Sequence, residues 1–395
     1  MSVLPASGVI SLARGVPAPD LFPVRELGEA SRRAFARHSA TALNYGPPAG
    51  FRPLQEWLAG RHGAAPDQVV IAPGSYILLA LLARVLARSG PVLVEAPTYD
   101  RVVSLLRQPG SGTRAVAVRR GQRGIDLAAL EQHLQRHREA AGRPAFGYVM
   151  PTFHNPTGTT MPGPDRERLA DLAVRYGLLL VEDDPYGQLR FGGAEPASLR
   201  ELLLARGAGH LSVFASSFSK IVAPGLRVGY AVLPEHLAGP VAQAALDTYV
   251  SPPLWPQAVV YEFLAAGFLP AHLARIRPLL RERRDALTSG LEAGLPAAAT
   301  WSVPDGGYFL WLELPGARTA GLLAEAERAG VTFVPGPGFF SDGGGDNAAR
   351  LSFSFHAPAD IRAGTDRLTA VARRHLSRAG AGPPPPRAGA ALTQR

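Results

Sequence analysis

The alternation of short apolar runs with helical stretches is the feature that most restricts the fold of this 395-residue chain. It extends from about residue 66 to residue 233. Strands that alternate with helices of about 10–15 residues form a mainly parallel sheet with helices on both faces. The pattern therefore predicts an α/β fold. The expected strands are 69–72, 91–95, 114–118, 146–150, 178–182, 211–215 and 227–233, and the helices among them are 75–88, 98–107, 126–140 and 164–176.

The rhythm changes after residue 234, where the pattern is mostly helical up to about residue 293. From residue 300 two apolar strands and two helices indicate a smaller α+β domain. We expect four parts, and the last of them includes four consecutive prolines, which favour disorder. They are an N-terminal segment 1–40 that packs on the small domain, a large domain 41–293, a small C-terminal domain 294–376 and a disordered tail 377–395.

Composition excludes several kinds of site. The chain has no cysteine, which rules out disulfides, thiolate nucleophiles and cysteine-based zinc sites. It has no apolar run of about 18 residues and no signal-peptide pattern at its start, so we expect a cytoplasmic protein without a membrane span. The net charge of +9 comes without a basic run interleaved with aromatic residues, so we expect no nucleic-acid partner. His133 and His137 have an i,i+4 spacing that could suit a metal, but they stand on an Arg/Gln-rich helix face without a carboxylate ligand, so we expect no metal.

The basic residues are more informative than the net charge. Lysine and arginine total 41, and Lys220 is the single lysine, which leaves 40 arginines. A lysine amine can lose its proton and form an imine with an aldehyde, whereas arginine stays protonated and cannot act as a nucleophilic amine. Composition alone also allows a lysine that survived by chance, so the neighbourhood of Lys220 has to decide.

That neighbourhood favours a functional role. The segment 216–227 lies between two predicted strands, at the edge of the sheet. Besides Lys220 it offers the hydroxyl groups of Ser217 and Ser219 and the guanidinium of Arg227. The amine suits an aldehyde, and the other three groups suit a phosphate. For the serines alone, turn capping is the alternative.

Two further segments follow predicted strands. Asp183 stands at the carboxyl end of a buried strand, where ligands of open parallel sheets bind. A carboxylate there can keep a pyridine nitrogen protonated, and Tyr186 could donate a hydrogen bond to a phenolate oxygen of the same ring. Asn155, in an Asn-Pro turn, could donate to that oxygen as well. An ordinary acidic loop and an ordinary turn are the alternatives.

A phosphate site is also expected where a strand meets a helix. Gly74, Ser75 and Tyr76 join the strand 69–72 to the next helix. The free backbone N–H groups of a helix N-terminus bind phosphate, although many α/β turns look similar.

Together these motifs resemble the fold-type I pyridoxal 5′-phosphate (PLP) enzymes of the class I/II aminotransferase family. Within it, the chain is most similar to the aminoadipate/kynurenine aminotransferases and the aminotransferase-like part of MocR regulators. The resemblance covers roughly residues 10–376. It rests on the order and spacing of the segments 155–158, 183–186, 217–220 with Arg227, and 350–353.

The resemblance implies a role for each candidate residue. Lys220 would form the internal aldimine with PLP and then move the proton between substrate and cofactor. Asp183 would pair with the pyridinium nitrogen, and Asn155 and Tyr186 would bind the phenolate oxygen. Arg350 would bind the substrate α-carboxylate with a bidentate pair, next to Asn155. Tyr99 would stack on the ring, and Tyr45 would reach the phosphate of the neighbouring subunit in a homodimer with composite active sites. The residues expected around the phosphate are Gly74, Ser75, Tyr76, Ser217, Ser219 and Arg227.

The chain departs from its relatives at several positions. Relatives usually carry Gln where Tyr76 stands and a small residue where Arg14 stands, and many have an additional N-terminal stretch. His154, before the motif asparagine, is also less usual. Because Arg14 and Gly15 lie in the segment expected at the mouth of the pocket, we assign them to substrate binding. Arg14 could bind a second carboxylate, or it could point to solvent.

The resemblance implies an aminotransferase that moves an amino group between an L-amino acid and a 2-oxo acid by a ping-pong mechanism. 2-Oxoglutarate is the expected acceptor. A PLP-dependent lyase, decarboxylase or oxidase is the alternative, because the same electron sink supports all of these reactions. A ligand-sensing regulator domain is a third reading. It is disfavoured because the motif region begins about ten residues from the start of the sequence and leaves no room for a winged helix.

Overall fold

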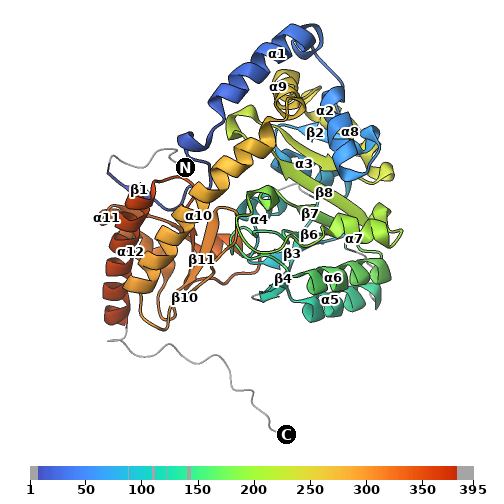
Figure 1. Cartoon of the computed structure of the whole chain (residues 1–395). Coiled ribbons are helices and arrows are strands. Elements are labelled where there is room, and N and C mark those ends of the chain that lie inside the picture. Colours follow the sequence, from blue (N-terminus) through green and yellow to red (C-terminus); the bar gives the residue numbers. More distant parts are fainter. Residues whose placement is uncertain (1–7, 88, 109–111, 122, 140–143, 380–395) are drawn as a thin grey trace.

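A computed structural model describes residues 8–87, 89–108, 112–121, 123–139 and 144–379. Its centre is an eight-stranded sheet with the order β2-β9-β8-β7-β6-β3-β4-β5 (Figure 1). The pairs from β4 through β3, β6 and β7 to β8 are parallel, which confirms the mainly parallel sheet expected from the sequence. The strands are β2 (Val69–Ala72), β3 (Val92–Ala96), β4 (Ala115–Gly121), β5 (Gly124–Ile125), β6 (Phe146–Val149), β7 (Leu180–Asp183), β8 (Ser212–Ser217) and β9 (Gly229–Val232).

Alternate residues of these strands enter two separate cores on opposite faces of the sheet. Leu93, Val149 and Leu180 belong to the core beneath α5, α6 and α7, whereas Tyr148 and Val181 belong to the larger core. Because side chains alternate along a strand, Asp183 shares the face of Val181, and Glu182 lies on the opposite face. The helices around this sheet are α2 (Arg52–His62), α3 (Ser75–Val85), α4 (Asp100–Leu106), α5 (Leu127–Glu139), α6 (Gly163–Tyr176), α7 (Leu199–Ala205), α8 (Glu235–Tyr249) and α9 (Leu254–Ala265).

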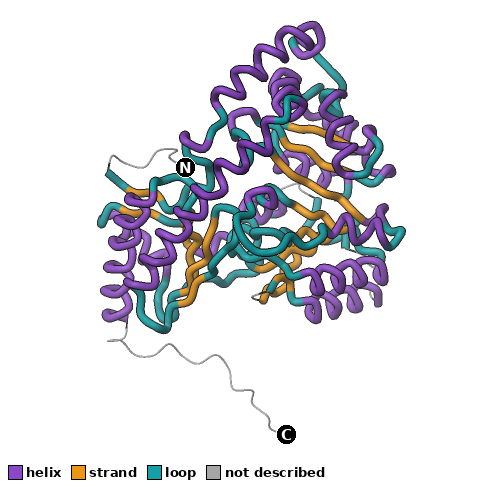
Figure 2. The backbone as a smooth tube through the Cα atoms, in the orientation of Figure 1, coloured by secondary structure: helices purple, strands orange, loops and turns teal. Residues whose placement is uncertain are grey.

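A second sheet, with the order β10-β11-β14-β13, is antiparallel throughout and forms the centre of the small domain (Figure 2). Its strands are β10 (Thr300–Trp301), β11 (Phe309–Glu313), β13 (Val334–Pro335) and β14 (Ala348–Ser352), and it is accompanied by α11 (Thr319–Arg328) and α12 (Pro358–Ala379). The helix α10 (Phe268–Gly294) follows α9 and packs along α12, so it links the two parts of the molecule (Figure 1).

The N-terminal part of the chain divides between both domains. The strand β1 (Ile10–Ser11) pairs in parallel with β12 (Val331–Thr332), which lies in the C-terminal part of the chain. The helix α1 (Val24–Ala42) instead packs against α9 of the large domain. The expectation that all of residues 1–40 pack on the small domain is therefore too broad. The helix α1 buries only alanines on its inner side, namely Ala30, Ala34 and Ala42.

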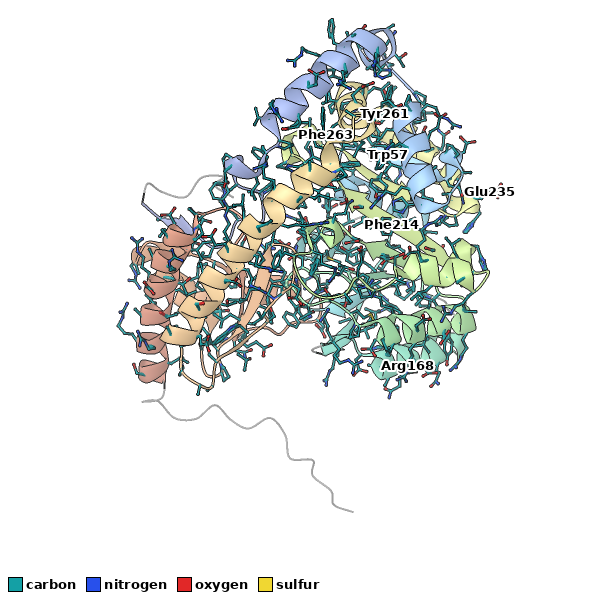
Figure 3. The ribbon with its side chains drawn as sticks, in the orientation of Figure 1. Trp57, Arg168, Phe214, Glu235, Tyr261 and Phe263 are labelled. Atoms are coloured by element: carbon teal, nitrogen blue, oxygen red, sulfur yellow. The ribbon has the colours of Figure 1, made fainter. Side chains whose placement is uncertain are left out.

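Apolar side chains fill the space between α2, α9 and the sheet (Figure 3). Phe263 of α9 is fully buried, and Trp57 of α2 and Tyr261 of α9 pack partly buried against the same core. No single helix in the described ranges is long and apolar enough to cross a membrane, and α9 with α10 passes that test only as a pair bent by 87°. The helix α12 ends at Ala379, three residues beyond the predicted limit of the small domain, and the rest of the predicted tail, 380–395, lies outside the described residues.

Candidate active site

Lys220 lies three residues after the end of β8, in the loop that leads to β9. Its Nζ donates a hydrogen bond of 2.7 Å to the carbonyl oxygen of Gly15, and the hydroxyl of Tyr308 donates to the Lys220 carbonyl at 2.6 Å. Burial lowers the pKa of the amine to about 8, and the nearby guanidinium groups of Arg350 and Arg227 act in the same direction. A fraction of this amine is therefore unprotonated near neutral pH, which a nucleophilic amine requires.

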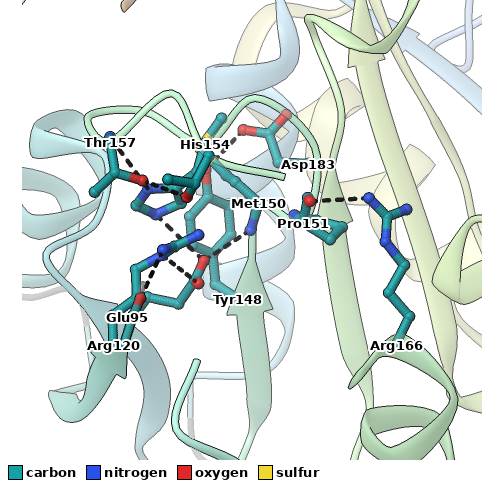
Figure 4. Close-up of polar contacts among 11 residues, drawn as sticks. Glu95, Arg120, Tyr148, Met150, Pro151, His154, Thr157, Arg166 and Asp183 are labelled. Atoms are coloured by element: carbon teal, nitrogen blue, oxygen red, sulfur yellow. Dashed lines mark hydrogen bonds and ion pairs between the residues drawn. The ribbon is translucent and has the colours of Figure 1, made fainter. Parts of the chain in front are cut away.

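Asp183 lies at the end of β7 and is 2% exposed. The hydroxyl of Tyr148, on the neighbouring strand β6, donates to its Oδ2 at 2.7 Å (Figure 4). Its Oδ1 is buried and makes no hydrogen bond with any described residue. Burial raises the pKa of Asp183 to about 7, although the Tyr148 hydrogen bond opposes the shift. A buried carboxylate oxygen without a donor is suited to a cationic N–H group of a ligand.

Aromatic residues surround this carboxylate. Tyr186 is buried, and its ring meets the rings of Tyr308 and Phe309 edge-on, with centroids 5.6 and 5.8 Å away. Burial raises the pKa of Tyr186 well above 10, so its hydroxyl stays protonated and can donate a hydrogen bond. Tyr99 stands directly before α4, and burial, with Asp100 and Asp183 nearby, raises the pKa of its phenol to about 12.

The expected phosphate residues converge at the start of α3. Ser217 pairs with Gly229 in the sheet, and Gly229 pairs with Ala72 at the end of β2. Gly74 follows with a positive φ of 103°, and a Cβ atom on it would lie 2.6 Å from Nη2 of Arg227. That Nη2 donates to the Pro73 carbonyl at 2.7 Å.

The serine hydroxyls lie beside this turn. Ser217 Oγ donates to Ser219 Oγ at 2.8 Å. The free N–H groups at the start of α3, two hydroxyls and a guanidinium therefore lie at one place, as a phosphate site requires. Tyr76 stands in the first turn of α3, and its ring is half-buried against the large core.

Arg350 comes from β14 of the small domain and is 8% exposed. Its Nη1 donates to Asn155 Oδ1 at 3.0 Å, and its Nη2 donates to the Ala13 carbonyl at 3.1 Å. The guanidinium carbon lies 4.1 Å from the ring centroid of Phe309 and 5.1 Å from that of Phe339. Nε is buried and makes no hydrogen bond within the described part of the chain. The arginine is thus held in place with a donor still available for a carboxylate.

The N-terminal segment, residues 10–16, lies between Lys220 and the small domain. A Cβ atom on Gly15 would overlap the ring of Phe309, so only glycine fits there without a shift. The carbonyl of Arg14 accepts hydrogen bonds from Ser352 and Ser354 at 2.6 and 3.2 Å. The Arg14 guanidinium lies over the ring of Phe355, 4.0 Å from its centroid. The structure therefore places the backbone of Arg14 beside the site and its side chain on an aromatic ring.

Tyr45, which we expect to reach the phosphate of a neighbouring subunit, is 84% exposed and buries little of its ring in its own chain. The sequence predicted no metal at His133 and His137, and the side chain of His137 lies outside the described residues. In the described ranges, no group of three or more His, Asp or Glu side chains could hold a metal ion.

Sequence reasoning missed Tyr148, Tyr308, Phe309 and Phe339. For Tyr148 a signal existed, because strand alternation places residue 148 on one face of the predicted strand 146–150, next to the strand that ends in Asp183. The three others contact the site only because the small domain folds against the large one.

Cavities of about 1010 and 1030 Å³ adjoin Gly187, Gln188, Arg190 and Glu195, which line both. The larger one opens toward Glu182, on the face of β7 opposite to Asp183. None of the candidate residues lines either cavity. The chemistry-bearing groups are instead the amine, carboxylate, hydroxyl and guanidinium groups on the Asp183 face. Their types fit a phosphorylated pyridine aldehyde, because each part of such a molecule has a matching group there.

Comparisons with known proteins agree with this geometry. The family model for aminotransferase class I and II matches residues 7–368. The chain is 40% identical over 364 residues to a 2-aminoadipate transaminase of Thermus thermophilus, which covers 91% of this chain and 89% of that protein. It is 33% identical to aromatic-amino-acid aminotransferase 1 of Thermococcus litoralis, over 96% of this chain and 91% of that one.

A solved structure is similar as well. The crystal structure of LysN, the α-aminoadipate aminotransferase of T. thermophilus complexed with N-(5′-phosphopyridoxyl)-L-leucine, has a TM-score of 0.88 and 38% identity, and covers 94% of each chain.

Proposed function

We propose a substrate class and a division of roles for a chain that belongs to the class I and II aminotransferase family. The protein is a PLP-dependent aminotransferase. We propose that it moves the amino group of an L-amino acid to a 2-oxo acid by a ping-pong mechanism, with 2-oxoglutarate as the acceptor. The contact that carries this proposal is that of Arg350 with Asn155, because it fixes a buried guanidinium near the amine of Lys220. Amino acids and 2-oxo acids both present a carboxylate to such a group.

The residues present fit the cofactor. Asp183 Oδ1 would face its ring nitrogen, Asn155 and Tyr186 its ring oxygen and Tyr99 its ring face. Its phosphate would bind at the start of α3 and at Arg227, and its aldehyde would meet Lys220. When bound, PLP supplies an electron sink that makes the hydrogen on the substrate α-carbon acidic.

Lys220 is the residue that moves this proton. With a pKa lowered to about 8, its Nζ can accept a proton and give it up again near neutral pH. Asp183 Oδ1 would accept a hydrogen bond from the protonated ring nitrogen. Tyr148 fixes the orientation of the carboxylate by donating to the other oxygen, Oδ2. Arg350 orients the substrate by its carboxylate, so that the α-hydrogen faces one amine in both half-reactions.

A donor panel tests the proposal. Each amino acid is incubated with the enzyme and either 2-oxoglutarate or pyruvate, and the products are identified by mass spectrometry. We expect glutamate, or alanine with pyruvate, together with the oxo acid of the donor. Release of carbon dioxide, of ammonia or of a donor fragment without formation of a new amino acid would instead support the decarboxylase, oxidase or lyase reading.

We also propose a homodimer with composite active sites. Phe35, Leu43, Tyr45 and Val250 are exposed by 59, 64, 84 and 53%, more than apolar side chains of a monomer need to be. The segments that carry them meet at the start of α9, because Phe35 contacts the ring of Trp255 edge-on, and a Cβ atom on Gly46 would overlap Leu254. A second copy that covers this patch would bury Tyr45 near the phosphate site of its partner.

The oligomeric state is measured by light scattering. Leu43→Asp should dissociate the dimer and reduce cofactor retention. Tyr45→Phe should leave the dimer intact and weaken retention by about 1.5–3 kcal/mol, the worth of a hydrogen bond to a charged group. A wild-type monomer with full activity would contradict the proposal.

A further inference from the structure

A buried ion pair of Glu95 and Arg120 lies beside His154, the residue before Asn155 (Figure 4). Its centre is Glu95 of β3, which is 2% exposed. Arg120 Nε, from β4, donates to Glu95 Oε1 at 3.1 Å, and the backbone N–H of Met150 donates to Oε2 at 2.9 Å. His154 is fully buried, and its Nε2 lies 3.4 Å from the same Oε2. One carboxylate thus joins β3, β4 and the residue after β6, and it faces the imidazole of the turn.

The contacts of His154 define its protonation. Thr157 donates its backbone N–H to Nδ1 at 3.4 Å, and its hydroxyl lies 2.9 Å from the same nitrogen. Because a backbone N–H can only donate, Nδ1 is an acceptor and the proton of the neutral ring sits on Nε2, toward Glu95. Burial lowers the pKa of His154 to about 4, and Arg120 adds to the effect. The histidine is therefore neutral: its Nδ1 is bonded to Thr157, and its Nε2 faces Glu95 at 3.4 Å without a hydrogen bond to any described residue.

The turn is closed by its own hydrogen bonds. The N–H of His154 donates to the Thr159 carbonyl at 2.9 Å, and that of Gly158 donates to the His154 carbonyl at 2.6 Å. The Thr157 and Thr159 hydroxyls lie 2.8 Å apart. The neighbour of His154 in this closed turn is Asn155, whose Oδ1 accepts from Arg350. The imidazole holds the inner side of the turn, and the amide meets the arginine of the small domain.

Glu95 also leads into the other wall of the site. Four residues after it comes Tyr99, and Thr98 between them donates its N–H to the Phe339 carbonyl at 2.8 Å. Phe339 is one of the two rings beside Arg350. The carboxylate therefore braces two loops that both reach Arg350, one through Asn155 and one through Phe339.

We propose that His154 is a positioning residue, which through Glu95 and Thr157 fixes Asn155 and thereby the carboxylate-binding geometry of Arg350. The inference rests on the proposed function, because it assigns Arg350 to the substrate carboxylate. A histidine that only fills the core would stabilise the fold without affecting Arg350.

Three replacements at one position separate these roles. His154→Asn keeps an acceptor near the place of Nδ1, His154→Gln keeps a donor near the place of Nε2, and His154→Ala keeps neither. The first measurement is the dissociation constant of a non-reacting carboxylate analogue of the donor, obtained by calorimetry on the holoenzyme. The second is the pH titration of the cofactor absorbance, which responds to the hydrogen bond that Asn155 makes to the ring.

For His154→Ala we expect the dissociation constant and KM to rise at least about tenfold, the worth of one hydrogen bond to a charged group. We expect kcat to change less and the absorbance titration to shift. His154→Asn should recover most of the affinity. Thr157→Val removes the hydroxyl that contacts His154 Nδ1 and leaves the imidazole in place. It should therefore also raise the dissociation constant, and it tests the proposal even if His154→Ala does not fold.

The chain offers a matched control. Glu262 of α9 is also 2% exposed and also meets an arginine and a histidine: Arg37 Nη1 donates to Oε2 at 3.2 Å, and His38 Nε2 lies 2.8 Å from Oε1. His38→Ala should lower the melting temperature and leave the dissociation constant unchanged. If His154→Ala and Thr157→Val do the same as His38→Ala, the positioning role is refuted. If the wild type transaminates no donor in the panel, the proposed function fails separately.

Discussion

The two halves of the active site are built in different ways. The large-domain half has its main groups at or shortly after the carboxyl ends of strands of one sheet: Asp183 ends β7, and Lys220 lies three residues after β8. The other half joins the N-terminal segment to β14, and its contacts link residues more than 300 positions apart, as when Arg350 donates to the Ala13 carbonyl. The sheet fixes the groups to which we assign the chemistry. The second half, to which we assign the substrate carboxylate, depends on how two distant segments meet.

This difference predicts which variants affect every substrate and which affect only some. Variants of the sheet-borne half should abolish or weaken the reaction whatever the side chain of the donor. Variants of the other half should change binding, and the outermost of them should distinguish one substrate class from another.

The largest effect is expected for Lys220→Arg. The charge is retained but the nucleophilic amine is lost, so turnover should fall by more than about 10³-fold with every donor. Circular dichroism checks that the variant is folded. In the wild type, borohydride reduction should attach the cofactor to one peptide, the one that contains Lys220, and substantial transamination by the variant would sink this assignment.

Asp183→Asn should weaken the reaction but stabilise the cofactor-free protein at high pH. The pKa of Asp183 is raised to about 7 from 3.8, so the native state holds this proton more tightly than the unfolded chain does. The cofactor-free protein should therefore lose stability as the pH rises from about 4 to 7, by about 3–4 kcal/mol from this group.

The variant lacks this titration and should be more stable than the wild type at pH 8 without cofactor, although it is a poorer enzyme with it. Denaturant unfolding at several pH values measures both proteins. Parallel stability curves for the two would show that Asp183 does not carry the shift.

Arg350→Ala should lower kcat/KM by the equivalent of about 3 kcal/mol of transition-state stabilisation. The loss should be the same for amino donors and oxo acceptors, since all of them carry the carboxylate. The measurement is steady-state kinetics of both half-reactions. If only one half-reaction suffered, Arg350 would belong to the side-chain pocket, and the comparison between the halves would need to be redrawn.

The smallest effect is expected for Arg14→Ala, because the Arg14 side chain is half-buried on Phe355. If Arg14 binds a distal carboxylate, KM should rise for dicarboxylic substrates only. The rise should correspond to a loss of up to about 1.5 kcal/mol of binding free energy. Arg14→Lys, which keeps the charge, is the matched control and should recover part of the loss. An equal change for both substrate classes would make Arg14 a support of the N-terminal segment.

The sequence predicted the fold best where strands and helices alternate regularly. The apolar run 178–182 placed Asp183 at the carboxyl end of a strand, and the single lysine drew attention to the loop after β8. The packing of α1 was not predictable, because the alanines that it buries do not indicate which surface they cover. The contact of Arg14 with Phe355 was not predictable either, since a sequence does not state which segments 341 positions apart will touch. Tyr148 lay within reach of prediction, because it needed only the neighbour order of β6 and β7.

The burial of Lys220 has a practical consequence for anyone who handles this protein. It is the only side-chain amine in 395 residues, and the cofactor would occupy it. Amine-directed dyes and lysine-reactive surfaces have no other side chain to attach to. Slow labelling of Lys220 would therefore count the sites that have lost their cofactor, and resin coupling by lysine would select for the inactive fraction. Reagents directed to the exposed Asp and Glu carboxyl groups are suited to immobilising the working enzyme, whereas arginine-directed reagents could also modify Arg227 and Arg350.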